Sequence, residues 1–406
     1  MAKVSASQNT VELSFTHSVA TLVKHHFPAL PSRGLDHLAD ATLVSQPLTL
    51  FDVNGQPLFH DYALSREGSV VGTIRTAANR SLGSPVISIT HTAPGWTPER
   101  ALRLATESLH AKEAKSIIQD WQLVVYAYPK VGIRLHFKLP GKKQAQSQIF
   151  DVASGDAVAS SREPDHQFTQ YSLLDSLKPS EIAARRKLFA KAEAHIQQLK
   201  AAEPALFVPS QPTTQAVLAK VSVSVIQLGI RQGLVLLSPY CPNSPIGLTH
   251  YSQITNYFCV PASAQMLMEH YGWNYTQNQI ATAMGTSAAQ GGTNGTGLTS
   301  GFASLTHNSL PLSFDNGGTR DQQFQDAINE ISANRPLFTQ VPHHYRVCVG
   351  YSENLLEVLF LELGLSQMLY IYDPWPWNTD LCQGGAIYWE SWATSPVMWF
   401  GIVRHA

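Results

Sequence analysis

The sequence predicts an α+β protein made of a small N-terminal part and a larger C-terminal part. Three observations lead to this prediction. A helix followed by a three-strand antiparallel meander accounts for much of the first 160 residues. Pro204, Pro209 and Pro212 then interrupt the chain, since proline is unfavourable inside helices and strands. Beyond them, a helix that begins near residue 261 is followed by separate β-rich stretches.

Composition restricts the class of protein. The 406 residues contain 28 basic and 29 acidic side chains, so the net charge of −1 argues against nucleic acid as a partner. With 44% hydrophobic residues, the chain can bury a large core. No apolar run reaches the length of a membrane span, and the N-terminus lacks the apolar core of a secretory signal. We therefore expect a cytoplasmic protein by default, with no membrane partner; secretion stays open.

The N-terminal part is predicted element by element. Apolar spacing predicts a helix over Ser14–Phe27, and Asn54-Gly55 predicts the turn of a hairpin over Leu48–Leu64. Thr97 followed by Pro98 is typical of a helix start, and we expect that helix to run to about Trp121. The remaining predicted strands are Ser69–Arg75, Pro85–Thr90, Leu123–Tyr128, Gly132–Leu139 and Gln148–Val152.

The meander after a helix resembles PepSY-like and cystatin-like domains. That resemblance implies a propeptide or an inhibitor of a protease. A second long helix is expected from Pro179. We therefore divide the chain into an N-terminal α+β domain (1–170), a helix with a Pro-rich linker (171–215) and a C-terminal domain (216–406).

Cys259 is the strongest candidate for chemistry. The helix predicted from Pro261 to about Tyr271 places this cysteine at or just before a helix N-terminus. Unpaired N–H groups and the helix dipole favour a thiolate there, and the thiolate is the nucleophilic form. Gln253, six residues upstream, could supply a side-chain N–H to an oxyanion hole together with the Cys259 backbone N–H.

A base and an orienting acid follow downstream. Residues 341–351 have a strand pattern in which His343 and His344 would face opposite sides of the sheet. Another strand ends in Asp373 and Pro374, and its carboxylate could hold an imidazole in the required orientation. Adjacent histidines on a strand diverge, so we expect no metal site and no cofactor.

Together these residues resemble papain-like cysteine peptidases, and most closely the C39-like peptidase group. The resemblance covers about residues 238–403 and rests on the cysteine with its upstream glutamine, the histidine six residues before Gly350, and the aspartate before a proline. It implies that Cys259 is the nucleophile, His344 the general base, Asp373 the orienting residue and Gln253 the oxyanion donor. The papain-type stretch Cys-Gly-Ser-Cys-Trp is absent.

Two assignments stay open. The interval of 29 residues from His344 to Asp373 is long, so Asn378 is an alternative orienting residue. Cys241 and Cys382 lie in Pro- and Gly-rich loops and could form a disulfide bond.

The resemblance implies a peptidase that hydrolyses polypeptides through a thioester, and the domain order suggests a self-processed zymogen inhibited by its own N-terminal domain. It also implies that the glycine-rich loop at Gly291, Gly292 and Thr293 binds extended substrate; a plain flexible loop is the alternative. Two rivals remain: an amidase or acyl transferase that uses the same cysteine, and a non-catalytic peptide-binding module.

Overall fold

The computed structural model describes residues 10–25, 41–90, 92–159, 170–202, 204, 225–234, 248–315, 317–358 and 361–403. Helices and mostly antiparallel strands both contribute, as expected for the α+β class. Pro209, Pro212 and Cys241 lie outside the described residues. None of the described helices has the length and apolarity needed to cross a membrane.

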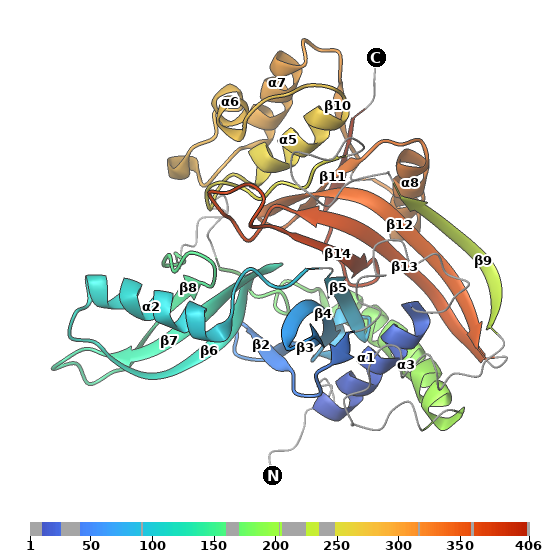
Figure 1. The fold of residues 1–406 in the computed structure, drawn as a ribbon, viewed down its shortest axis with the longest axis horizontal. Coiled ribbons are helices and arrows are strands. Elements are labelled where there is room, and N and C mark those ends of the chain that lie inside the picture. Colours follow the sequence, from blue (N-terminus) through green and yellow to red (C-terminus); the bar gives the residue numbers. More distant parts are fainter. Residues whose placement is uncertain are drawn as a thin grey trace.

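In its described part, the N-terminal region contains helices and a set of strands (Figure 1). These elements are α1 (Val11–His25), β1 (Thr42–Leu43), β2 (Leu48–Asp52), β3 (Pro57–Arg66), β4 (Ser69–Ala77), η2 (Arg80–Leu82), β5 (Val86–Thr90), α2 (Pro98–Lys112), β6 (Ile117–Ala127), β7 (Lys130–Lys138) and β8 (Gln146–Asp151). The long helix α3 (Pro179–Ala202) follows.

The C-terminal region begins with β9 (Val225–Leu234). The remaining elements are α5 (Cys259–His270), α6 (Gln277–Ala283), η4 (Ala288–Gln290), α7 (Gly295–Leu305), β10 (Leu312–Asp315), α8 (Arg320–Ser332), β11 (Leu337–Val341), β12 (His344–Val358), β13 (Leu361–Asp373), β14 (Ala386–Ser391) and β15 (Trp399–Val403). Figure 1 shows α5, α6 and α7 grouped together at one end of the molecule.

The strands of the two regions form one continuous sheet. Its order is β10-β15-β11-β12-β13-β14-β5-β4-β3-β2-β6-β7-β8. The two regions join where β14 pairs with β5, with Trp389 opposite Ile89 and Glu390 opposite Ser88. The meander of β6, β7 and β8 is antiparallel, as the sequence predicts. The N-terminal domain (1–170) and the C-terminal domain (216–406) proposed from the sequence therefore both contribute strands to this sheet.

One predicted helix is too long. Thr97 caps α2 and Pro98 occupies its first position, as expected, but the helix ends at Lys112 rather than near Trp121. Residues from Ile117 onward belong to β6, where Ile118 lies opposite Phe137 of β7. β-branched side chains favour strands, and pairing with β7 satisfies this backbone. The tertiary contact therefore decides the conformation.

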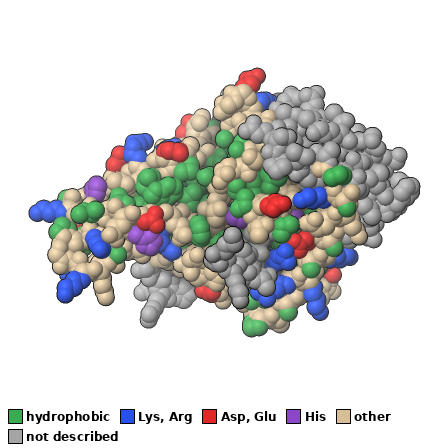
Figure 2. All heavy atoms as spheres, turned by 90° about the horizontal axis from the view of Figure 1, so that it is seen from below, with side chains coloured by type: hydrophobic (Ala, Val, Ile, Leu, Met, Phe, Trp, Pro, Cys, Tyr) green, Lys and Arg blue, Asp and Glu red, His purple; other side chains and the backbone are tan. Residues whose placement is uncertain are grey.

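The hydrophobic core also spans both regions. One cluster joins Tyr62 and Ile74 of the N-terminal region to Val260 of α5 and Trp389 of β14. A second cluster joins Ile133 of the meander to C-terminal strands. On the face shown in Figure 2, acidic and basic side chains are interspersed, in keeping with the net charge near zero.

Candidate active site

Cys259 is the first residue of α5 and its side chain is fully buried. The preceding residue, Phe258, cannot cap the helix with its side chain, so the first-turn amides are not satisfied by a capping group. The sulfur instead interacts with the backbone amides of Tyr345 and Val260. Cys259 is not disulfide-bonded and lies beside the start of β12, where His344 is located.

His344 and Asp373 form a buried pair. His344 opens β12 and Asp373 ends the neighbouring strand β13. The ring Nε2 lies 2.7 Å from Asp373 Oδ1, and both side chains are at most 1% exposed. The other ring nitrogen, Nδ1, is buried without a hydrogen-bond partner among the described residues. A ring held at Nε2 presents Nδ1 as the atom that can exchange a proton.

The strand predicted over residues 341–351 is interrupted. Residues 342–343 form a tight turn between β11 and β12, and His343 adopts φ +59° in that turn. The two histidines therefore do not face opposite sides of one strand. His343 lies with its ring centroid 5.7 Å from that of Tyr171, a residue of the N-terminal region. The long interval between His344 and Asp373 is explained by the β12–β13 hairpin, which also pairs with β9.

Gln253 is buried close to the same strand end. Its backbone N–H donates to the Pro374 carbonyl, and its side-chain Nε2 donates to the Thr255 carbonyl at 2.7 Å. The side-chain Oε1 is buried without a partner among the described residues. Asn378 donates its backbone N–H to Gln253, and its Oδ1 accepts from Asp380. No contact among the described residues joins Asn378 to His344, whereas Asp373 forms a hydrogen bond with His344 directly.

The glycine-rich loop is partly folded on itself. Gly292 pairs with Ser287 through both its N–H and its carbonyl, and Thr293 shares a hydroxyl contact with Thr286. Gly291 has φ +66° and ends the short helix η4. Asn294 caps α7, so the end of the glycine-rich segment is helical rather than loop. In this structure the loop pairs with its own backbone.

Burial sets the protonation of the central groups. It lowers the pKa of His344 to about 4; Asp373 opposes this shift, while Lys130 and Arg346 add to it. Burial raises the pKa of the Cys259 thiol, and Lys130 and the Tyr345 amide partly offset that effect. For Asp373, burial would raise the pKa, but His344, Arg346 and the Trp375 N–H together hold it below its ordinary value. At neutral pH the closed site therefore holds a neutral imidazole beside a carboxylate.

Lys130 is a site residue that sequence reasoning missed. It opens β7 in the N-terminal region, yet its side chain is only 1% exposed. Burial lowers its pKa, while the charges of Cys259, Asp151 and Asp373 oppose that shift. A lysine after Tyr-Pro is typical of a surface turn, so no sequence pattern indicated that it is buried beside the cysteine.

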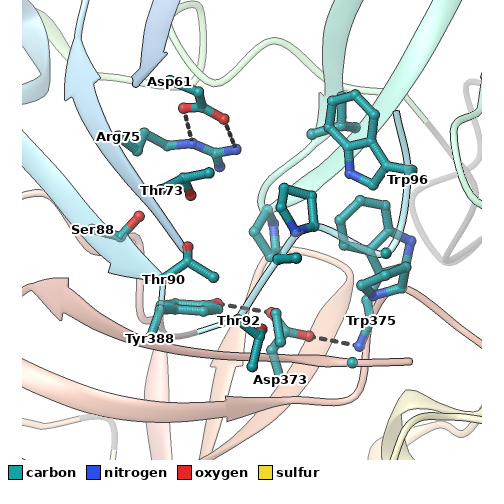
Figure 3. A pocket seen from close by; sticks show the side chains of 18 of the residues that line it. Asp61, Thr73, Arg75, Ser88, Thr90, Thr92, Trp96, Asp373, Trp375 and Tyr388 are labelled. Carbon is teal, nitrogen blue, oxygen red and sulfur yellow. Dashed lines mark hydrogen bonds and ion pairs between the residues drawn. The ribbon is translucent and has the colours of Figure 1, made fainter. Parts of the chain in front are cut away.

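A pocket opens next to Asp373, between the two regions (Figure 3). One wall carries the ion pair of Arg75 with Asp61 together with hydroxyl side chains of β4 and β5. Trp96 and Trp375 lie on the opposite side. Asp373 lines this pocket, whereas His344 does not.

Comparison with known proteins bears on the C-terminal region. Residues 246–395 match the model of the Peptidase_C39 like family. Over these residues the C-terminal region is therefore similar to the C39-like peptidases. The match lies inside the segment for which the sequence suggested this resemblance. No curated protein matches the chain.

Among solved structures, a mutant fragment of prointerpain A from Prevotella intermedia is similar at 12% identity. The alignment covers 88% of this chain and 98% of that one, with a TM-score of 0.27.

The other cysteines are separate from the candidate site chemistry. Cys348 is a free, buried thiol on β12, and burial raises its pKa to about 12. Cys382 is disulfide-bonded. Cys241, the partner considered from the sequence, lies outside the described residues.

Proposed function

We propose that the protein is a cysteine peptidase whose nucleophile is Cys259. The observation that carries this proposal is the buried His344–Asp373 pair at the strand end against which the Cys259 sulfur lies. The C39-like family match over the same residues supports the reaction class. A thiol at a helix N-terminus, an imidazole and an orienting carboxylate are the parts that acyl transfer requires.

The chemistry follows from these positions. When the site opens to substrate, His344 takes the Cys259 proton at Nδ1 while Asp373 holds the ring at Nε2. The thiolate attacks the peptide carbonyl, and the Cys259 N–H and Gln253 stabilise the oxyanion. The imidazolium then protonates the leaving amine, which leaves a thioester. Water activated by His344 hydrolyses the thioester and restores the thiol.

Intact-mass analysis of the purified full-length protein over time tests this proposal. Wild type should produce defined fragments that Cys259→Ala does not. Identical fragments from both would contradict self-processing, and exogenous peptides that stay intact after the site has been opened would contradict peptidase activity. Product analysis with an amine acceptor distinguishes hydrolysis from acyl transfer. Iodoacetamide labelling at mildly acidic pH, carried out after the site has been opened, distinguishes both from a binding module, which should still lack a hyper-reactive Cys259.

We further propose that the N-terminal region acts as the inhibitor of this site. Its residues contact the chain next to each central residue. Asp156 accepts from Asn256, three residues before the cysteine. Tyr171 lies against His343. Asp151 accepts from the Trp375 indole, two residues after Asp373.

Lys130 lies at the centre of these contacts. Its buried amino group interacts with Asp151 and Asp373, and Tyr128 of the same turn donates to Glu390 of β14. Because Cys259 and His344 are both fully buried, a polypeptide can reach them only after this turn moves away. In this proposal the N-terminal region closes the site with the side chain of Lys130.

Replacement of Lys130 tests this inhibitory role. Lys130→Glu would bring a third carboxylate close to Asp151 and Asp373, and juxtaposed like charges cost several kcal/mol. We expect alkylation of Cys259 by iodoacetamide to accelerate at least about tenfold. Lys142→Glu, at an exposed position, makes the same charge change as a control. Equal labelling rates in the two variants, with both folded, would contradict the closure by Lys130.

A further inference from the structure

A buried ion pair is linked to Asp373 through one intervening side chain, Tyr388. This ion pair is not part of the chemistry described above. Arg346 of β12 and Glu390 of β14 are both 0% exposed. Arg346 donates from Nη1 to Glu390 Oε1 at 2.9 Å and from Nη2 to Oε2 at 3.1 Å. Ser395 also donates to Oε2, at 2.6 Å, and Tyr128 donates to Oε1. Burying such a pair is costly unless its hydrogen bonds are satisfied.

Tyr388 connects this ion pair to Asp373. Its hydroxyl accepts a hydrogen bond from Arg346 Nη1 at 2.9 Å and donates one to Asp373 Oδ2 at 2.8 Å. Figure 3 shows the Tyr388 ring directed toward the carboxylate from β14. The other carboxylate oxygen, Oδ1, accepts from Trp375 N–H and faces His344 Nε2. Both oxygens of Asp373 therefore have fixed partners.

The hydroxyl has a specific consequence. If Arg346 bound Asp373 directly, the guanidinium would compete with the imidazole for the carboxylate. Glu390 holds the guanidinium in a two-point contact, and the tyrosine hydroxyl passes on only a hydrogen bond. Asp373 thus remains an anion whose Oδ1 is directed at His344.

We propose that Tyr388 is a positioning residue: its hydroxyl, held by the Arg346–Glu390 pair, fixes the orientation and the ionised state of Asp373 for His344. This inference deepens the proposed function and rests on it for its catalytic meaning. Its structural content, the coupling of Tyr388 to the His344–Asp373 pair, stands independently of activity.

The test is the titration of the His344 ring, followed by NMR in histidine-labelled protein and assigned from the signal that disappears in His344→Gln. Tyr388→Phe removes only the hydroxyl. Without that donor, the carboxylate is a stronger acceptor, so the His344–Asp373 pair takes up its first proton at higher pH, by about one unit. The variant does not replace any of the charged and titratable groups around the pair, which are Cys259, Lys130, Asp151, His250, Arg346 and Glu390.

Tyr351→Phe is the matched control. It removes a buried hydroxyl on β12 that contacts Ser332, 3.0 Å away, and does not touch Asp373. We expect no shift of the His344 titration in this variant. If Tyr388→Phe does not fold, 3-fluorotyrosine in place of Tyr388 keeps the ring and makes a stronger donor. That protein should titrate in the opposite direction, at lower pH.

Activity provides the second readout. If the proposed function holds, Tyr388→Phe should lower kcat about tenfold with little change in KM, and the acid limb of the pH–rate profile should move upward. An unchanged His344 titration in folded Tyr388→Phe, or an equal shift in Tyr351→Phe, would overturn the inference. If Tyr388→Phe shifts the His344 titration but the wild-type protein shows no peptidase activity, the coupling is supported and the proposed function is refuted.

Discussion

Acid is expected to destabilise the folded protein through His344. The ring is buried in a neutral form, with its pKa lowered to about 4, whereas an exposed histidine in the unfolded chain titrates near 6.5. Because the unfolded chain binds the proton first, stability is fully present above the unfolded pKa and is lost as pH falls through the window from about 6.5 to 4. The lowered pKa of Asp373 acts in the same direction at lower pH.

The expected magnitude follows from the size of the shift. A difference of about 2.5 pH units corresponds to about 3 kcal/mol in the acid limit, at about 1.4 kcal/mol per unit. Between pH 7 and pH 5, about 2 kcal/mol of this is lost. Burial of His17, whose pKa is lowered to about 3, adds a similar loss to the wild-type total. The informative quantity is therefore the difference between wild type and a variant that lacks His344.

Urea unfolding at pH 7 and pH 5 measures this difference. The loss of unfolding free energy on acidification should be about 2 kcal/mol smaller in His344→Gln than in wild type. His110→Gln, on the exposed face of α2, controls for removing a histidine from the chain. Equal losses in wild type and His344→Gln would refute the conclusion that this ring is buried and neutral in the closed site.

Two further outcomes are expected. Gln253→Ala should lower kcat about 10²- to 10³-fold in a peptide-cleavage assay of the opened enzyme, because one oxyanion donor is lost; an unchanged kcat would exclude that role. Gly385→Ala should lower the unfolding free energy by about 1–3 kcal/mol in urea titrations, since φ is +71° and a Cβ would lie 2.3 Å from His250 Cε1. Gly295→Ala, where a Cβ meets nothing within 4 Å, should not destabilise; equal losses at both glycines would contradict this packing argument.

Local signals in the sequence predicted many of the individual elements. Asn54-Gly55 specifies the turn between β2 and β3, and Thr97 with Pro98 specifies the start of α2. The same kind of signal predicted the helix behind Cys259. Each of these depends on residues within a few positions of one another, and such short-range interactions can be predicted from a single sequence.

The rest depends on contacts between distant segments. The end of α2 was misplaced because β7 pairs with residues 117–127, and the turn at His343 was missed because β11 and β12 form a hairpin. Nothing near Lys130 indicated that a strand end from the N-terminal region would be buried beside Cys259. Arg346 and Tyr388 are 42 positions apart, and only the sheet register brings them to Asp373.

The pairing of β14 with β5 constrains what a cut between the two regions could achieve. If the N-terminal strands left, the backbone of residues 388–390 would become an unpaired edge, and an exposed edge is a template for pairing with a foreign strand. Proteolysis alone would then yield a nicked complex that keeps its partner strand. Release of the C-terminal piece would require another segment to dock along β14, or the freed piece would tend to self-associate through that edge.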